Sequence, residues 1–292
     1  MAFNFSITNG CLELTANSKG AELSSVKNSK HNYEFIWQAN ADVWNRHAPI
    51  LFPIVGKLNN DQTEIDGNCY HMSQHGFARD CNFEMIDQSA NELSFKLLAS
   101  PETRVLYPFN FELIVTYSFT DVANQVKVTY HVNNLSDKAM PFSIGAHPGF
   151  QLPVKDLGEY EIDFYTIDSF QKELLSNGLF AEKAKEVKLK NSKLTLQEDS
   201  FSKDAIVIKD IVAKKIKLNH LHSDFAIEMA FNDFTDLGIW SKTNCQEFIC
   251  LEPWLGYADN VGYTGNMYNK KGIVLLESSQ SYTASYFMSF SI

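Results

Sequence analysis

The sequence contains few arginines and little positive charge of any kind. Three of its 25 basic residues are arginine (Arg46, Arg79 and Arg104), so bidentate guanidinium groups are confined to the first part of the chain. The formal net charge is -10 at pH 7. Nucleic acids and anionic membranes need clustered basic residues for charge neutralisation. The composition therefore excludes both as main partners.

Cysteine pairs and long apolar runs are also missing. The five cysteines form no CxxC pair and no Cys/His set with zinc-finger spacing. Scattered thiols of this kind are typical of a reducing cytosol. No apolar run approaches the roughly twenty residues of a membrane-spanning helix, and the N-terminal segment lacks the basic and apolar regions of a signal peptide. We expect a soluble, cytoplasmic protein.

The chain is long enough to build a large core. Its 292 residues are 45% hydrophobic and 13% aromatic, and a chain of this size buries about 75% of its unfolded surface. There is no composition break and no internal repeat of fixed period, which disfavours propellers and solenoids. We expect a single domain over residues 1–292.

Alternating apolar residues predict many short strands. The pattern is clearest at residues 111–119, 126–132, 225–231 and 282–292. Asn9-Gly10 and Asp66-Gly67 predict hairpin turns, the first of type I′. Residues 37–58 predict an ordered loop with a short strand, and residues 169–180 a helical turn ending near Gly178. A solvated surface segment without chemistry is expected after it. These features favour an antiparallel sandwich or larger layered β-architecture.

Three short motifs combine a titratable side chain with glycine or proline and an aromatic residue. They are Gln74-His75-Gly76-Phe77-Ala78-Arg79, Gly145-Ala146-His147-Pro148-Gly149-Phe150 and Leu251-Glu252-Pro253-Trp254-Leu255-Gly256. The glycines beside His147 allow close backbone approach by a ligand. Considered singly, His147 is also consistent with a core histidine and His75 with a polar turn residue, but three such motifs in one chain favour chemistry.

Glu252 follows an apolar run that we expect to be buried on both faces. Burial would raise the pKa of its carboxyl group from about 4.3 toward the range of a general base near neutral pH. A strand-end glutamate that points to water is the alternative. Two imidazoles and a carboxylate are also a possible metal-ligand set, but no spacing places two of them on one element. A nucleophilic triad is weaker still, because GxSxG is absent.

At these motifs the sequence resembles the aldose 1-epimerase (galactose mutarotase-like) family, in its LacX-like branch. The segments WNRHAPILFPIVGKL, QHGFAR, GAHPGF, FSKDAIVI and LEPWLG occur in family order and cover most of the chain. The resemblance implies an all-β fold, a large twisted antiparallel β-sandwich (supersandwich) with few short helices. It also implies a sugar-binding cleft on one side.

The resemblance further implies a mutarotase that interconverts the anomers of a free aldose. Glu252 would take a proton from the anomeric hydroxyl and His147 would deliver one to the ring oxygen, while His75 polarises the ring. The implied substrate-binding residues are Arg46, Asp204, Arg79, Phe150 and Trp254. No metal and no cofactor is required, the partner is a small-molecule sugar, and the chain is expected as a monomer or homodimer.

One departure from the family affects the substrate. Galactose mutarotases carry an Asn-His pair followed by Tyr-Phe, whereas here Ala146 precedes His147 and Pro148-Gly149-Phe150 follows it. Galactose specificity is therefore open, and a hexose phosphate is an alternative substrate because Arg46, Lys57 and Arg79 form a small basic group. A non-catalytic carbohydrate-binding or sensing protein is another alternative, and a metal-dependent isomerase is a third.

Overall fold

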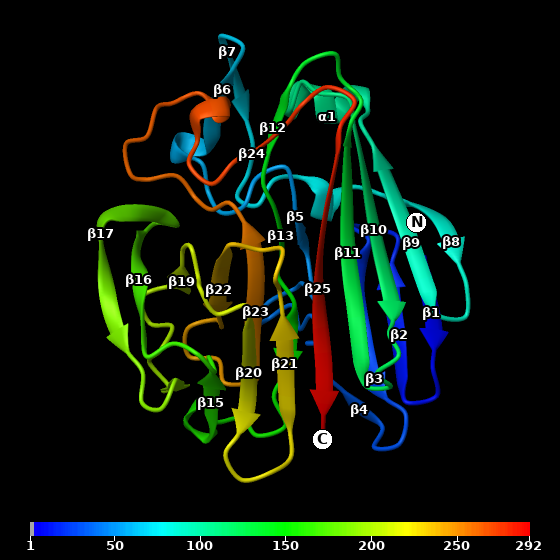
Figure 1. Cartoon of the computed structure of the whole chain (residues 1–292), viewed down its shortest axis with the longest axis vertical. Coiled ribbons are helices and arrows are strands. Elements are labelled where there is room, and N and C mark those ends of the chain that lie inside the picture. Colours follow the sequence, from blue (N-terminus) through cyan, green and yellow to red (C-terminus); the bar gives the residue numbers. More distant parts are fainter. Residues whose placement is uncertain (1–2) are drawn as a thin grey trace.

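The computed structural model describes residues 3–292, except the side chain of Glu182. Its largest sheet has nine antiparallel strands (Figure 1). Their spatial order is β18 (Lys193–Thr195), β15 (Tyr160–Asp163), β20 (Lys215–His220), β21 (Ala226–Ala230), β25 (Ser281–Ser291), β11 (Gln125–Asn134), β10 (Phe111–Phe119), β9 (Glu92–Leu98) and β8 (Glu84–Gln88).

A second sheet of eight strands carries the His147 and Glu252 motifs. Its order is β17 (Leu179–Lys188), β16 (Ser169–Ser176), β19 (Ile206–Ile208), β22 (Asp236–Trp240), β23 (Phe248–Leu255), β13 (Ile144–Ala146) and β5 (Ile50–Leu51), and β14 (Gly149–Gln151) also pairs with β23. The central position of β23 matters for the site, because a central strand is held on both edges by neighbouring strands.

The remaining elements are small. A four-stranded sheet consists of β1 (Asn4–Thr8), β2 (Leu12–Asn17), β3 (Glu22–Asn28) and β4 (Tyr33–Glu34), and two ribbons pair β6 (Gln62–Ile65) with β7 (Asn68–His71) and β12 (Met140–Phe142) with β24 (Val274–Leu276). The helices are α1 (Pro101–Leu106), η1 (Asn59–Asp61), η2 (Ala78–Asp80), η3 (Leu157–Glu159) and η4 (Met267–Asn269). Over residues 3–292, no helix is long and apolar enough to cross a membrane.

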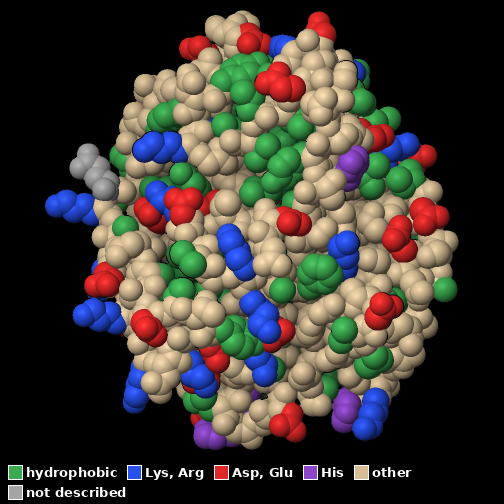
Figure 2. Space-filling view, viewed as in Figure 1, with side chains coloured by type: hydrophobic (Ala, Val, Ile, Leu, Met, Phe, Trp, Pro, Cys, Tyr) green, Lys and Arg blue, Asp and Glu red, His purple; other side chains and the backbone are tan. Residues whose placement is uncertain are grey.

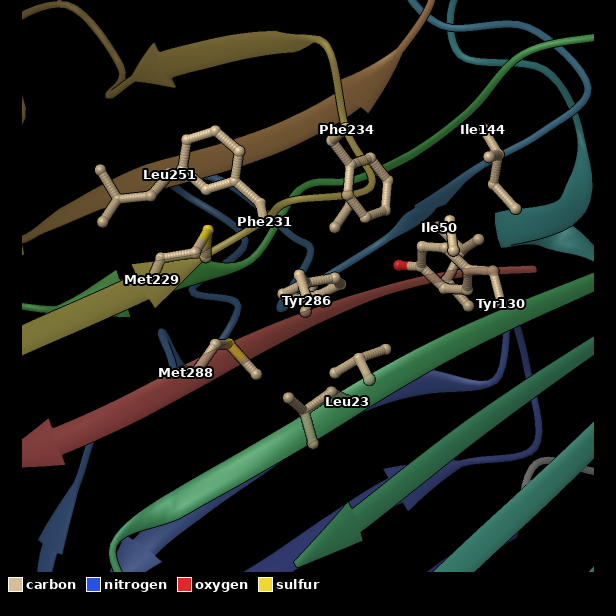
Figure 3. Close-up of a cluster of buried hydrophobic side chains, with 14 of the residues drawn as sticks. Leu23, Ile50, Tyr130, Ile144, Met229, Phe231, Phe234, Leu251, Tyr286 and Met288 are labelled. Carbon is tan, nitrogen blue, oxygen red and sulfur yellow. The ribbon is translucent and has the colours of Figure 1, made fainter. Parts of the chain in front are cut away.

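The core lies between the two large sheets and extends under the four-stranded one. Figure 3 shows buried side chains from both sheets meeting, with Leu251 of β23 and Met229 of β21 on one side of the cluster and Tyr286 of β25 between them and Leu23 of β3. These residues occupy alternate strand positions, as the period of a strand requires. On one exposed face, acidic and basic side chains are interspersed, with basic groups along the edge where β17 lies (Figure 2).

The predicted alternation is confirmed in the long strands. In β11, Val126 and Val128 are buried, whereas His131 points outward and its Nδ1 lies 2.8 Å from Oγ1 of Thr283 on β25. The predicted burial of the run before Glu252 is also confirmed, because all eight residues of β23 are buried.

The two hairpin predictions have different outcomes. Asp66 and Gly67 connect β6 to β7 with φ of 51° and 77°, the positive values that a type I′ turn requires. At Asn9-Gly10 the hairpin is confirmed, but the type I′ turn is wrong. Thr8 pairs with Glu13, so four residues form the connection, and the side-chain Oδ1 of Asn9 accepts hydrogen bonds from two backbone N–H groups in it.

The predicted helical turn over residues 169–180 is also wrong. This segment is the hairpin of β16 and β17, closed by Asn177 and Gly178 with φ of 52° and 79°. Two consecutive residues with positive φ end one strand and begin the next, and Asn-Gly tolerates this conformation best. The local helical pattern was overridden by the antiparallel ladder between β16 and β17, and β16 also pairs with β19 at one position in the second sheet.

Candidate active site

Strand register places His147 directly opposite Glu252. Gly145 of β13 pairs with Trp254, and Gly149 of β14 pairs with Cys250, both on the same strand β23. His147 is midway between the two glycines and Glu252 is midway between their partners. As a result, Nε2 of His147 lies 3.3 Å from Oε2 of Glu252. A single ladder therefore brings together two residues more than a hundred positions apart.

His75 reaches the same place from the loop after β7. Its backbone N–H donates to the carbonyl of Gly56, and the N–H of Gly56 donates to Nδ1 of His75 at 3.1 Å. Since Nδ1 is an acceptor, the neutral ring carries its proton on Nε2. The side-chain nitrogen of Gln74, 3.3 Å from Nε2, is itself a donor and does not accept this proton. The rings of His75 and His147 are 5.6 Å apart and nearly perpendicular. His75 thus presents an N–H donor next to the pair.

The glycines of the His147 motif make room for tryptophan rings. A Cβ on Gly145 would come within 2.6 Å of the indole of Trp254, and one on Gly238 of the neighbouring strand within 2.5 Å. A Cβ on Gly149 would come within 2.8 Å of the indole of Trp44. The close approach that was predicted for a ligand is made instead by tryptophan side chains, which line the site.

Replacing Gly238 by alanine should displace the Trp254 ring. The added methyl group has no space against a buried, rigid indole, and overpacking of this kind costs about 1–3 kcal/mol of the free energy of unfolding. Urea denaturation measures the loss. Gly158→Ala is the control, because its Cβ would meet the carboxylate end of Asp156. Equal stability of the two variants would contradict the packing described.

Burial sets the charge state of the acid–base pair. It raises the pKa of Glu252 well above the ordinary value, and the negative charge of Asp204 acts in the same direction. Burial lowers the pKa of His147 to about 3. Both shifts favour the uncharged forms. The favoured resting state is therefore a carboxylic acid next to a neutral imidazole.

His75 should make stability depend on pH. Burial lowers its pKa well below the ordinary 6.5, and the electrostatic influence of the neighbouring His147 and Arg79 acts in the same direction. Below pH 6.5 the unfolded chain binds a proton that the folded chain does not, so stability falls as pH falls. The contribution is about 1.4 kcal/mol per pH unit. Chemical denaturation at several pH values below 6.5 gives the slope of the free energy of unfolding against pH. This slope should be smaller by that amount in His75→Gln than in the wild-type protein. An unchanged slope would show that His75 is already charged in the folded protein.

The pair and His75 lie in a cleft of about 460 Å³, a volume typical of small-molecule sites. Three predicted binding residues, Arg79, Asp204 and Trp254, line it. Arg79 is fixed there by a 2.7 Å hydrogen bond from its guanidinium to the carbonyl of Gln74. Six of the eight residues predicted from the sequence therefore converge on one cavity.

The other two predicted binding residues lie elsewhere. Phe150 is completely buried and packs against Ile36 and Phe290 in the main core, because β14 turns alternate residues away from the cleft. It is not a ligand-contacting residue in this structure, and the prediction is corrected. Arg46 forms a 2.6 Å ion pair with Asp80 and also contacts the backbone of Arg79 outside the cleft lining. Arg46 is therefore not among the residues that line the cleft.

Several lining residues were not predicted. The ring of Trp44 stacks on His147 at 5.0 Å, and Trp240 contacts the same imidazole edge-on at 5.7 Å. Asn177 and Phe180, from the hairpin of β16 and β17, also line the cleft. The Asn-Gly dipeptide at positions 177 and 178 was the available signal for a turn. No local pattern indicated that this turn reaches the cleft.

One group of side chains could hold a metal ion. Ligand atoms of His147, Cys250 and Glu252 all lie within 4.8 Å of one another. The expectation that no two ligands share an element overlooked Cys250, which is two residues before Glu252 and on the same face of β23.

Residues 4–286 match the family model described as aldose 1-epimerase. The chain belongs to the aldose 1-epimerase family. It is 32% identical over 267 residues to the plasmid-encoded protein LacX of Lactococcus lactis, a match that covers 87% of this chain and 88% of LacX. The predicted membership of this family and its LacX-like branch is confirmed.

Two solved structures are especially similar to the structure of this chain. A galactose mutarotase related enzyme from Lactobacillus acidophilus is 32% identical, with a TM-score of 0.93 over 99% of this chain and 97% of that one. A galactose mutarotase-like protein from Lactobacillus casei is 30% identical, with a TM-score of 0.92 over 99% and 100%. The predicted all-β antiparallel fold is therefore confirmed. Family membership also supports a mutarotase-type enzyme that acts on sugars.

Proposed function

We propose that the chain is a mutarotase that interconverts the α and β anomers of a free aldose. The observation that carries the proposal is the 3.3 Å contact between His147 and Glu252 at the floor of the cleft. A buried acid–base pair is unnecessary for binding alone, which needs hydrogen bonds and stacking. It is suited to moving a proton on and off a hemiacetal.

Ring opening requires one proton to leave the anomeric hydroxyl and one to reach the ring oxygen. Both oxygens are bonded to the same carbon, so a base and an acid a few ångströms apart can serve both. Transfer of the shared proton from Glu252 to His147 gives a carboxylate and an imidazolium. The carboxylate then takes the hydroxyl proton, the bond between the anomeric carbon and the ring oxygen breaks, and the imidazolium protonates that oxygen.

Reclosure reverses these steps after rotation about the first carbon–carbon bond. The carbonyl then presents its other face to the ring oxygen, and the opposite anomer forms. His75 is placed to donate its Nε2 proton to a sugar oxygen. Asp204 and Arg79 offer further hydrogen bonds to hydroxyls, and Trp254 offers an apolar face. The scheme uses no cofactor, because each proton passes between side chains and substrate.

A hexose phosphate is a second candidate substrate, because Lys57 and Arg79 both line the cleft and can neutralise a phosphate. Asp204 lies in the same cleft and opposes an anion there. The free aldose is therefore preferred.

The proposal is tested by polarimetry of freshly dissolved α-anomers of several aldoses and aldose phosphates. A catalysed approach to equilibrium with at least one free aldose, faster than in buffer alone, is the expected result. Acceleration of phosphorylated sugars only would favour the second candidate. If no sugar in a broad panel equilibrates faster, the chain is a carbohydrate-binding protein or has another activity.

A further inference from the structure

The face of β23 that carries Glu252 also carries a thiol. Alternate residues of a strand point to the same side, so Cys250 and Glu252 face the cleft side of the sheet while Ile249 and Leu251 join the main core. His147 is opposite Glu252 in the ladder, and Gly149, two residues after His147, is opposite Cys250. One ligand atom from each of the three residues lies within 4.8 Å of the others.

The buried side chains of this group are not fully satisfied by hydrogen bonds. Among the described residues, Oε2 of Glu252 and Nδ1 of His147 are buried without a hydrogen-bond partner, and the side chain of Glu252 is 2% exposed. Most buried polar atoms in proteins are partnered. The rings of Trp44 and Trp240 pack against His147. His147 and Glu252 still line the cleft, so an ion can reach them from it. A cation bound by several of these side chains at once would compensate for their burial.

Thiolate, imidazole and carboxylate together suit a thiophilic cation. Zinc binds sulfur at about 2.3 Å and nitrogen or oxygen at about 2.0–2.2 Å in a tetrahedron, whereas magnesium and calcium prefer oxygen ligands. Tetrahedral ligands bonded at these lengths are themselves about 3.3–3.8 Å apart. The present spread of up to 4.8 Å must therefore contract by about 1 Å. Three protein ligands would leave the fourth position open toward the cleft.

We infer that His147, Cys250 and Glu252 form a binding site for a thiophilic divalent cation such as Zn²⁺, and that its occupancy blocks the acid–base pair. The thiol proton and the proton shared by the pair leave to solvent as the ion binds. The carboxylate and imidazole lone pairs are then committed to the metal and cannot exchange protons with a sugar. The inhibition rests on the proposed mutarotase function, whereas the binding does not.

A surface pair must be removed before this site is measured. Sγ of Cys69 lies 3.9 Å from Nε2 of His71 on the exposed strand β7. That pair can also bind a thiophilic metal. The starting protein is therefore the Cys69→Ser variant, and Cys250→Ala is made in that background. Alanine is small and apolar, as the buried position of Cys250 requires.

Titration with Co²⁺, monitored by absorption, reads out the ligands without any sugar. In Cys69→Ser we expect one equivalent to produce tetrahedral ligand-field bands and a thiolate-to-cobalt charge-transfer band. Cys250→Ala should lose the charge-transfer band. Its persistence in Cys250→Ala, or its absence from Cys69→Ser, would overturn the site. Because Glu252→Gln should weaken Co²⁺ binding with the thiol intact, that variant repeats the test should Cys250→Ala fail to fold.

Inhibition by the bound metal is tested with the aldose that polarimetry identifies as a substrate. Zn²⁺ at saturating concentration should lower the catalysed rate at least tenfold in Cys69→Ser, and the chelator EDTA should restore it. Cys250→Ala should keep its rate in the presence of the same Zn²⁺ concentration. Cobalt binding without inhibition would overturn the blocking role alone. Cobalt binding to a protein that accelerates no sugar would support the metal site while refuting the mutarotase.

Discussion

Replacing Glu252 by glutamine is expected to lower the catalysed rate of anomer exchange by roughly 10²- to 10⁴-fold, the usual contribution of one positioned acid or base. The amide has the same shape but cannot accept the hydroxyl proton. Because burial keeps the Glu252 carboxyl group protonated at rest, the change removes no charge from the folded protein. Stability and sugar binding should therefore be largely retained.

The measurement is the rate by polarimetry, with sugar affinity from calorimetry and stability from denaturation. Glu247→Gln is the matched control, because that residue directly precedes β23 and pairs with Lys155 on the surface. It should keep the wild-type rate. Full activity in Glu252→Gln would remove Glu252 from the mechanism, whereas lost sugar affinity with an unchanged maximal rate would reduce it to a binding residue.

Replacing His147 by glutamine is expected to lower the rate by a similar factor and to change its pH dependence. Since burial lowers the pKa of His147 to about 3, a second proton enters the pair only well below pH 6.5. The wild-type protein should therefore keep its catalysed rate as pH falls through 6.5, and the acidic limb should lie below that value.

The residual activity of His147→Gln should lack this acidic limb. Rates at each pH are corrected for the spontaneous reaction in the same buffer. His131→Gln, a change on the outer face of β11, is the control and should show the wild-type profile. A wild-type acidic limb centred near pH 6.5 would show that the imidazole titrates as if exposed, which contradicts its burial.

The fold was predictable because the burial pattern of a strand appears in the sequence as an alternation of apolar and polar residues. Val126 and Val128 alternate with polar neighbours, and Asp66-Gly67 encodes a tight turn. The same local reasoning failed at residues 169–180, where an apolar and charged mixture is compatible with either helix or strand. Pairing of β16 with β17 across the Asn177-Gly178 turn decided between them, and of this pairing only the Asn-Gly dipeptide leaves a mark in the local sequence.

The sequence predicted which residues belong to the site better than it predicted how they are placed relative to one another. His75, His147 and Glu252 stood out because each titratable group adjoins glycine or proline and an aromatic residue. Their contact depends on the register of β13 and β14 against β23, which no single motif contains. Phe150 was misassigned because its aromatic ring suited stacking, although strand alternation turns it into the core.

The glycines illustrate the same limit. Small residues at positions 145 and 149 correctly indicated close approach, but the approaching groups are Trp254 and Trp44. Both rings come from segments distant in sequence. Likewise, Cys250 had no evident role until the structure placed its thiol near Glu252 and His147.

The most direct test of the central claim is magnetisation transfer between the anomers of an equilibrated aldose. Selective saturation of the α-anomeric proton should reduce the β-anomeric signal through the open-chain form when the wild-type protein is present, and much less with Glu252→Gln at the same concentration. Because nothing net is converted, the experiment reports exchange alone. Line broadening that demonstrates sugar binding, without any transfer of saturation across the aldose panel, would contradict the mutarotase and identify a binding protein.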